Sequence, residues 1–123
     1  MHPRKKARIE ELLRRELSTI VLYELKDPRM GFMTITRVEL SGDQRSAKVR
    51  LTVRGAAEDT ARTLEGLKHA RGYIQRLIGD RLELRYTPVL SFEEDVEVRD
   101  AAHIEDLIDR ARREDREYRS DET

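Results

Sequence analysis

The 123-residue chain contains no cysteine and no tryptophan, and it has few prolines and few aromatic residues. Because cysteine is absent, disulfide bonds, thiolate zinc sites and cysteine nucleophiles are excluded, and nothing indicates export. The first residues carry the positive charge of a signal peptide, but Glu10 and Glu11 interrupt them before any apolar core. No apolar run approaches the length that spans a membrane. We therefore expect a single soluble domain in the cytoplasm.

The sequence also lacks the residue patterns that mark an enzyme. Its three histidines, His2, His69 and His103, lie far apart along the chain, and no phosphate-binding or dinucleotide-binding glycine motif occurs. His103 and Asp106 are three residues apart, but two ligands do not make a metal site. The acidic run 93–95 offers carboxylates for magnesium, although plain acidic runs usually hold none. We expect no catalytic residue, no metal, no cofactor and no small-molecule substrate.

The formal net charge is zero, but the charge is unevenly distributed along the chain. Residues 1–92 hold 19 Lys and Arg against 12 Asp and Glu, whereas residues 93–123 hold 6 against 13. A basic body followed by an acidic tail is common in proteins that bind nucleic acid, where the tail limits non-specific binding. The same asymmetry also occurs in soluble domains without such a partner. It favours an RNA or DNA partner and does not prove one.

The first helix is predicted over residues 4–25, because apolar residues recur there at spacings of three and four. Basic side chains crowd its first half: Arg4, Lys5, Lys6, Arg8, Arg14 and Arg15. Such a positive end suits a phosphate backbone, but the same residues can simply form the solvated face of a core helix. The glutamates among them argue against a helix that lies on a membrane surface.

Two strands are predicted next, over residues 32–40 and 45–54, and the turn 41–43 joins them into an antiparallel hairpin. Imperfect alternation in the first strand indicates a bulge near Arg37 or partial burial of both faces. The second strand alternates cleanly, and its outward row carries cations and no acid: Lys48, Arg50 and Arg54. Exposed strand cations usually protect a sheet edge, so this row alone is weak evidence for a phosphate site.

The stretch Ala70-Arg71-Gly72 interrupts a helical pattern that runs from about residue 60 to residue 78. A glycine inside a helix costs about 1 kcal/mol relative to alanine, so we expect a bend or a close approach to the backbone there. Lys68, Arg71 and Arg76 flank this point and suit a phosphate backbone. Two plainer interpretations remain, namely a helix that tolerates one glycine and two helices joined by a short turn.

A third strand is predicted over residues 88–92, after a helix that Gly79 closes, and the helical crossover favours a parallel neighbour for it. Because aromatic residues are few, base stacking is not expected to carry RNA affinity, and we assign Phe32 and Phe92 to the core. A last amphipathic helix is predicted over residues 101–113, with disorder after it. This order of elements predicts an α+β domain with helices on one face of a small sheet.

Several motifs, in this order, resemble the ribosome-binding factor A family. They are RIEELLRRELSTIV, LKDPRMGFMTITRVELSGDQRSAKVRLTV, LEGLKHARGYIQRLIG and LRYTPVLSFEED. The resemblance covers residues 4–95 and implies one KH-like domain of type II, with the order helix, strand, strand, kinked helix pair and strand. Residues 96–123 form an acidic extension beyond it. This family has an Ala-x-Gly kink where KH domains carry a GxxG loop, and Ala70-Arg71-Gly72 matches that kink.

The resemblance implies a non-enzymatic, monomeric factor that binds the 30S ribosomal subunit and 16S rRNA and assists late rRNA processing and 30S maturation. We expect RNA contacts from three groups: Arg4, Lys5, Lys6 and Arg8; Lys48, Arg50 and Arg54; and Lys68, Ala70, Arg71, Gly72 and Arg76. Two alternatives stay open. In one, the acidic C-terminal helix docks a basic protein partner. In the other, Glu93, Glu94 and Asp95 hold magnesium in a small RNA-processing enzyme.

Overall fold

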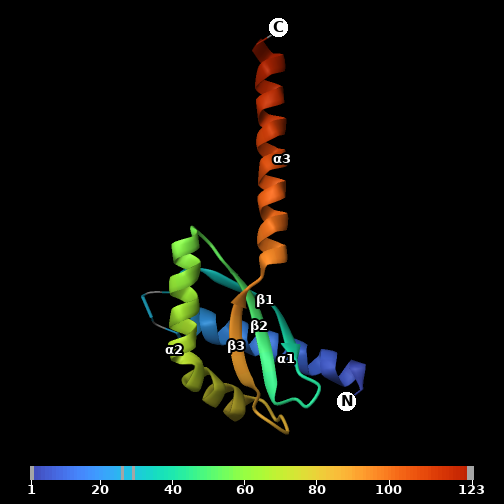
Figure 1. Cartoon of the computed structure of the whole chain (residues 1–123), viewed down its shortest axis with the longest axis vertical. Helices are drawn as coiled ribbons and strands as arrows, with labels where there is room; N and C mark the ends of the chain where they lie inside the picture. Colours follow the sequence, from blue (N-terminus) through green and yellow to red (C-terminus); the bar gives the residue numbers. More distant parts are fainter. Residues whose placement is uncertain (1, 26, 29, 122–123) are drawn as a thin grey trace.

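Three helices and three strands follow one another along the part of the chain that the structure describes, residues 2–25, 27–28 and 30–121. The structure is a computed structural model (Figure 1). Its elements are α1 (Pro3–Tyr23), β1 (Met33–Leu40), β2 (Ser46–Val53), α2 (Ala57–Arg81), β3 (Val89–Glu94) and α3 (Val96–Asp121). This order confirms the predicted α+β class.

The three strands form one mixed sheet in the order β1-β2-β3. β1 and β2 pair antiparallel, and their register shifts between Ile35 and Arg37, which confirms the predicted bulge. β3 pairs parallel to β2, with Ser46 opposite Val89. A parallel pair needs a long crossover connection, and α2 provides it. Both hairpin strands therefore form as expected, and β3 begins one residue later than predicted.

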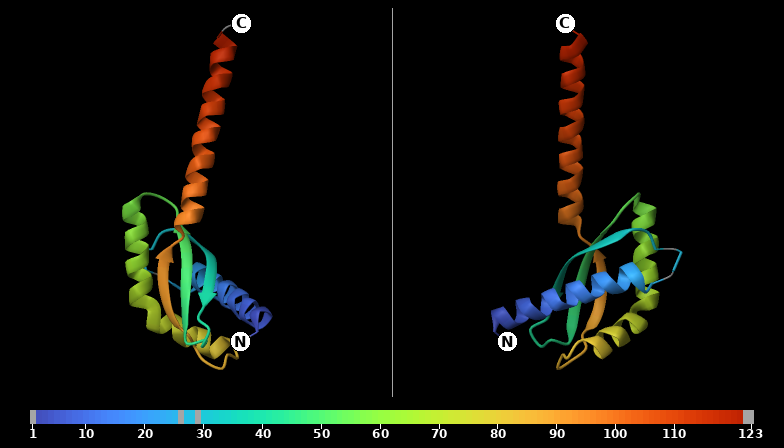
Figure 2. Two further views of the ribbon diagram at one scale, coloured as in Figure 1. Left: turned by 45° about the vertical axis from the view of Figure 1, so that its right-hand side comes forward. Right: turned by 180° about the vertical axis from the view of Figure 1, so that it is seen from behind.

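The core lies between the sheet and the two helices α1 and α2 (Figures 1 and 2). In α1, Ile9, Leu13, Leu17 and Ile20 repeat at helical spacing and are buried. They meet the inward side chains of the strands and of α2, which are Ile35, Val38, Leu40, Ala47, Val49, Leu51, Leu67, Ile74, Ile78 and Leu90. Full burial of one such aliphatic side chain stabilises the fold by roughly 1.5–3 kcal/mol. This shared apolar face fixes the position of both helices.

The prediction for one of the two phenylalanines is wrong. Phe92 is half-buried and packs against the core, but Phe32 is 80% exposed. Phe32 lies just before β1, and its carbonyl already accepts the Arg54 N–H at 2.9 Å, but its side chain lies outside the packed face of the sheet. Its ring therefore belongs to the surface, where it lines a groove together with exposed Leu22 of α1.

α2 is one continuous helix with a pronounced bend, so the predicted kink is present and the predicted division into a pair of helices is not (Figures 1 and 2). Every residue from 57 to 81 is helical, and the ribbon bends along its length (Figures 1 and 2). Thr63, Leu67, Ile74 and Ile78 are buried at spacings that fit one helical face, with half-buried Ala70 between them. Because core contacts continue on both sides of the glycine, the helix persists through it.

The other two glycines of α2 have roles that the sequence did not reveal. Gly79 lies inside the helix and does not end it, since the last cap is the Leu82 N–H bonded to the Ile78 carbonyl at 2.9 Å. A Cβ on Gly66 would stand 2.9 Å from Met30 Cγ. Gly66 is thus the point where the loop between α1 and β1 approaches the helix.

The C-terminal helix is longer than predicted at both ends. α3 begins at Val96 and not at residue 101, because buried Asp95 caps it by accepting the Val98 N–H at 3.2 Å. It continues past residue 113 to Asp121, where disorder was expected, and residues 122–123 of that predicted tail lie outside the described residues. The Arg110–Asp106 pair shows how i,i+4 charges support this polar helix. α3 projects away from the body (Figures 1 and 2).

Candidate nucleic-acid interface

A groove of about 210 Å³ runs between α2 and β3. Its floor and walls are Ala61, Leu64 and Phe92, and its charged side chains are Glu65, Lys68 and Arg71. Two residues of the predicted kink group, Lys68 and Arg71, therefore lie together. They come from successive turns of α2, three residues apart, so they face the same side of the helix.

Arg71 lines this groove, and one of its hydrogen-bond donors has no acceptor among the described residues. This donor is the buried Nε. Lys68 is exposed and has no carboxylate partner there either, because nearby Glu65 accepts from His69 at 3.1 Å. The lining therefore holds two cations, Lys68 and Arg71, and one acid, Glu65, which is engaged with His69. This balance of charge favours an anion in the groove.

Gly72 and Arg76 extend this site along the helix surface. Both are exposed, and they follow Lys68 at intervals of four residues, which places all three on one stripe of α2. A Cβ on Gly72 would meet nothing within 4 Å. Gly72 therefore leaves a gap between two cations where a bulky group can approach the backbone. Ala70 lies on the other side, half-buried against the core.

The basic residues at the start of α1 form a separate patch. Arg4, Lys5 and Arg8 are exposed, Lys6 is half-buried, and none has a carboxylate partner among the described residues. By contrast, the neighbouring arginines of α1 are engaged, since Arg14 and Arg15 donate to Glu11 at 2.7 and 3.0 Å. The Arg14 hydrogen bond, assisted by Arg15, lowers the pKa of Glu11 to about 2.

The cation row of β2 is not free, although β2 itself carries no acid. Lys48 Nζ lies 4.0 Å from Glu93 Oε1. Arg50 Nε lies 3.1 Å from Glu39 Oε1 and 3.4 Å from Glu93 Oε1. The strands on both sides of β2 supply these carboxylates, which the sequence of one strand cannot show. Only Arg54 of this row is exposed without a carboxylate partner in the described chain.

The acidic run after β3 does not gather into a metal site. Glu93 faces Lys48 and Arg50, and Glu94 pairs with Arg99 at 3.3 Å. Asp95 is buried, and the hydroxyl of Thr36 donates to it at 2.6 Å, which lowers the pKa of Asp95. No group of three or more potential metal ligands occurs among the described residues. The magnesium hypothesis thus has no cluster to rest on there.

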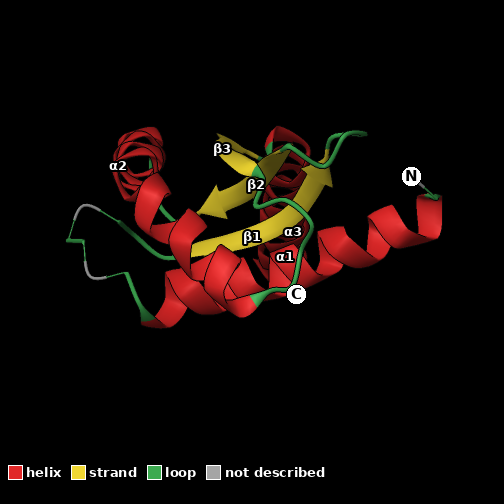
Figure 3. Ribbon diagram, turned by 90° about the horizontal axis from the view of Figure 1, so that it is seen from below, coloured by secondary structure: helices red, strands yellow, loops and turns green. Residues whose placement is uncertain are grey.

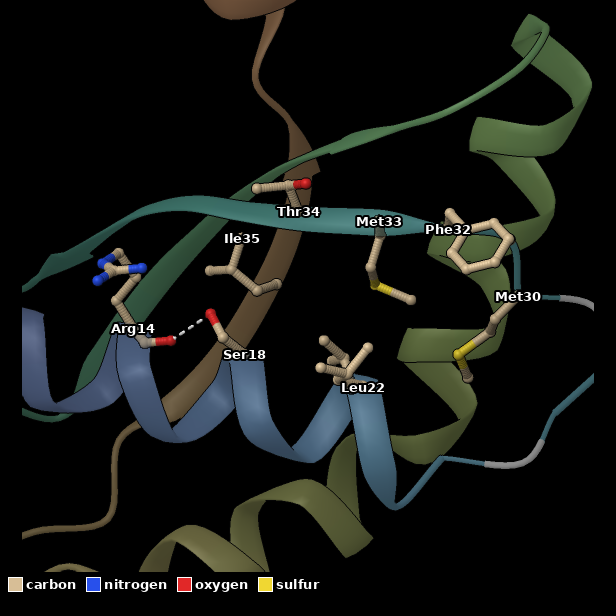
Figure 4. A pocket seen from close by; sticks show the side chains of 10 residues that line it. Arg14, Ser18, Leu22, Met30, Phe32, Met33, Thr34 and Ile35 are labelled. Atoms are coloured by element: carbon tan, nitrogen blue, oxygen red, sulfur yellow. Dashed lines mark hydrogen bonds between the residues drawn. The ribbon is translucent and has the colours of Figure 1, made fainter.

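A second, apolar groove of about 390 Å³ opens between α1 and β1 (Figure 4). Leu22, Met30, Met33 and the exposed ring of Phe32 surround it, and Arg14 stands at its other end. The sequence reasoning missed this groove because it placed Phe32 in the core. The cluster Met30-Gly31-Phe32-Met33 directly after a turn was the available signal.

The predicted basic groups lie on different elements of the fold. In Figures 1 and 3 the N-terminal end of α1 lies on the side of the molecule opposite the start of α2, and in Figure 1 the second half of α2 turns back beneath the sheet toward that side. Lys68, Arg71, Gly72 and Arg76 form one site, and the start of α1 forms another. No helix among the described residues has the length and the apolar character needed to cross a bilayer.

Sequence comparison places these features in a known group. The sequence profile described as RBFA, ribosome-binding factor A, matches residues 5–108. A ribosome-binding factor A from Halothermothrix orenii is 40% identical over 121 residues, which is 98% of this chain and 99% of the relative. The profile covers the body and the first half of α3, and the match to the Halothermothrix orenii relative extends over most of α3.

Solved structures agree with the fold. The solution NMR structure of a Thermotoga maritima protein superposes with a TM-score of 0.68 at 37% identity, over 77% of this chain and 92% of that chain. A homology model of Thermus thermophilus ribosome-binding factor A, fitted into a cryo-electron microscopy map of a 30S–RbfA complex, gives 0.61 at 28% identity. That match covers 72% of this chain and 93% of the other. The predicted KH-like α+β fold is confirmed.

Proposed function

Because the chain belongs to the ribosome-binding factor A family, we propose that it is an assembly factor that binds the 30S ribosomal subunit through 16S rRNA. It acts in the cytoplasm, as a monomer, and assists late rRNA processing and 30S maturation. The complex of the Thermus thermophilus relative with the 30S subunit supports this function. A protein-interaction module, the alternative from the sequence, is not favoured by a family match that runs across the whole body.

The observation that carries the proposal is the groove between α2 and β3. It joins Lys68 with an arginine whose buried Nε has no acceptor in the described chain. Arginine and lysine directed at one groove recognise phosphate oxygens, and phosphate contacts position a protein on RNA without reading its sequence. Gly72 and Arg76 continue the same stripe. We assign this site the main backbone contact with rRNA.

The other predicted RNA contacts differ in strength. Arg4, Lys5, Lys6, Arg8 and Arg54 have no carboxylate partner among the described residues, so they are available to phosphate groups. Lys48 and Arg50 are shared with Glu39 and Glu93. Binding of RNA there would have to break those pairs. We therefore give Lys48 and Arg50 a secondary part in binding.

The proposed factor does not catalyse a reaction. The three carboxylates that suggested an RNA-processing enzyme are engaged with Lys48, Arg50, Arg99 and Thr36. Incubation of the purified protein with precursor 16S rRNA and magnesium should leave the RNA intact. Cleavage that depends on the protein and disappears in a Glu93→Gln/Glu94→Gln variant would overturn the non-enzymatic assignment.

Co-sedimentation with 30S, 50S and 70S particles across a salt series tests the main proposal. Selective association with 30S particles is expected, and it should weaken steeply as salt rises because phosphate contacts release counterions. Equal association with all three particles would reduce the protein to a generic basic domain. Absence of binding to 30S particles at low salt would refute the function.

A further inference from the structure

A second polar cleft, of about 490 Å³, lies where α1 begins and where two loops of the sheet meet. We call it the Tyr86 cleft, and its charged and aromatic lining consists of His2, Lys5, Asp43, Arg45, Arg85 and Tyr86. The sequence reasoning did not select Arg45, Arg85 or Tyr86 for a site. These residues come from the β1–β2 turn and from the segment that leads into β3.

The two arginines of the Tyr86 cleft are oriented by one aromatic ring. The guanidinium carbon of Arg45 lies 4.8 Å from the centroid of Tyr86, and that of Arg85 lies 5.4 Å from it. An arginine near an aromatic face gains about 0.5–1 kcal/mol at an exposed site. This contact restricts both side chains, so less entropy is lost when they bind a ligand. The ring thus holds two guanidinium groups near one point of the cleft.

Hydrogen bonds of the backbone hold the two loops together. The Val89 N–H donates to the Arg45 carbonyl at 2.9 Å, which joins the β1–β2 turn to the start of β3. Within the turn, Asp43 accepts from the Ser41 hydroxyl at 2.6 Å and from the Arg45 N–H at 3.1 Å. Arg45 is therefore placed by a fixed turn.

Positive charge dominates the Tyr86 cleft. Asp43 is its single carboxylate, and the Ser41 hydroxyl bond, with the Arg45 N–H, lowers the pKa of Asp43, so its charge opposes an anion at neutral pH. Against it stand Lys5, Arg45 and Arg85, none of which forms a salt bridge among the described residues, and the charge of Arg45 helps to lower the pKa of Asp43. The start of α1, a helix of 21 residues, adds the positive end of its dipole. The balance favours an anionic ligand.

We infer that the Tyr86 cleft binds a phosphate group of an RNA strand, as a second contact separate from the groove between α2 and β3. This inference rests on the proposed function, since the RNA is the same rRNA. Arg45 and Arg85 hold the phosphate oxygens, Lys5 adds a third charge, and Tyr86 keeps the guanidinium groups in place. Two separate phosphate contacts on one RNA strengthen binding by raising the effective concentration at the second site.

The test compares two double variants of the full chain that lose the same charge. The cleft variant is Arg45→Gln with Arg85→Gln. The control is Arg62→Gln with Arg110→Gln, because both control arginines are exposed and lie elsewhere, paired with Asp59 and Asp106. Binding to 30S particles and to a 12-nucleotide uridine RNA is measured across a salt series. Circular dichroism confirms that each variant is folded, and the single variant Arg85→Gln replaces the cleft variant if the latter unfolds.

We expect the cleft variant to bind both 30S particles and uridine RNA about tenfold more weakly than the control, with a salt slope smaller by about 1 to 2. Equal affinity of the two variants for both probes would overturn the inference while leaving the proposed function intact. If the unaltered protein did not bind 30S particles at low salt, that result would instead refute the proposed function. To test for a free phosphate in the same cleft, inorganic phosphate is added as a competitor. If it displaced the unaltered protein from the uridine RNA at a concentration similar to that of the RNA itself, the assignment to an RNA strand would be overturned.

Discussion

Arginine side chains in this protein divide into those held by carboxylates and those left available. Arg50 lies between Glu39 and Glu93, and Arg81 bonds Glu16 and Glu24 across the two core helices. Exposed ion pairs of this kind contribute roughly 0–1 kcal/mol each, so their main effect is to fix geometry and to neutralise charge. Arg71 and Arg76 lack such partners in the described chain. Their charge is available to a ligand.

Replacing Arg71 and Arg76 by alanine should therefore weaken rRNA binding and leave the fold intact. Each loss of a phosphate contact is expected to reduce the salt slope by about 1. The loss of affinity should be the same for every RNA sequence, because phosphate contacts do not read bases. Co-sedimentation with 30S particles at several salt concentrations measures this change, with thermal unfolding as the control. An unfolded double variant would show that these arginines are structural.

The glycines of α2 offer a matched pair of substitutions. Gly72→Ala places a methyl group in open space, so it should stabilise the protein by up to about 1 kcal/mol through helix propensity. Gly66→Ala gains the same propensity but drives its Cβ against Met30 Cγ at 2.9 Å. It should be less stable than Gly72→Ala in urea unfolding. Equal stabilities would mean that the loop carrying Met30 moves away at no cost.

The same two glycines show what the sequence could not provide at this scale. Both interrupt one helical pattern, and neither the composition nor the periodicity reveals that Gly66 faces Met30 while Gly72 faces open space. That difference depends on a loop more than 30 residues away in the chain.

If the open backbone at Gly72 receives the RNA, Gly72→Ala should also weaken 30S binding despite its added stability. Unchanged affinity would remove Gly72 from the mechanism.

Periodicity predicted the elements of the body well because one buried face defines each of them. The alternation of Ala47, Val49 and Leu51 located β2, and the bulge in β1 followed from its broken alternation. α3 was misjudged because its described side chains, 96–116, are all exposed, so no buried face marks its ends. Its start depends on Asp95, whose partner Thr36 lies 59 residues earlier. Such a long-range cap is invisible in a local pattern.

Asp95 joins α3 to the sheet, and this joint should depend on pH. The Thr36 hydroxyl, the Val98 N–H, Arg37 and Arg50 outweigh burial and lower the pKa of Asp95 from its ordinary 3.8. The resulting stability is present above that value and is lost as pH falls through the lower pKa of the folded state. Asp95→Asn should lower the free energy of unfolding at pH 7 by about 1–2 kcal/mol.

Urea unfolding of both proteins between pH 2 and pH 7 measures this effect. The difference between the unaltered protein and the Asp95→Asn variant should shrink as the pH falls below about 4, because the carboxyl then becomes protonated. If the difference in the free energy of unfolding stayed constant over the whole pH range, the effect would come from hydrogen-bond geometry and not from the charge of Asp95. Asp106→Asn, on an exposed side chain of α3 that pairs with Arg110 and not with the groups around Asp95, serves as the control.

On the scale of the whole molecule, the most acidic part of the chain is also the part that projects from the body. Residues 1–95 hold 19 basic and 15 acidic residues, and residues 96–123 hold 6 basic and 10 acidic ones. α3 points away from the body, so most of its excess of acid lies away from the sheet and from α2 (Figure 2). The family resemblance predicted the α+β fold of the body, and the family match continues past residue 95 to residue 108. The acidic helix was predicted only over residues 101–113, and its full extent to Asp121 was not, since disorder and an exposed helix share the same composition.

Deleting residues 96–123 decides between an RNA-binding body and a partner-binding helix. The shortened chain keeps Asp95 with its Thr36 bond, so the sheet and the core should remain folded. Its net charge becomes positive, and unfavourable repulsion between α3 and phosphate groups disappears. Binding to 30S particles should therefore persist or strengthen, by up to about tenfold at low salt, with a difference that vanishes as screening increases. A folded, shortened chain that no longer binds 30S particles would place the essential contact on α3, where Ile104, Leu107 and Ile108 are exposed along one face.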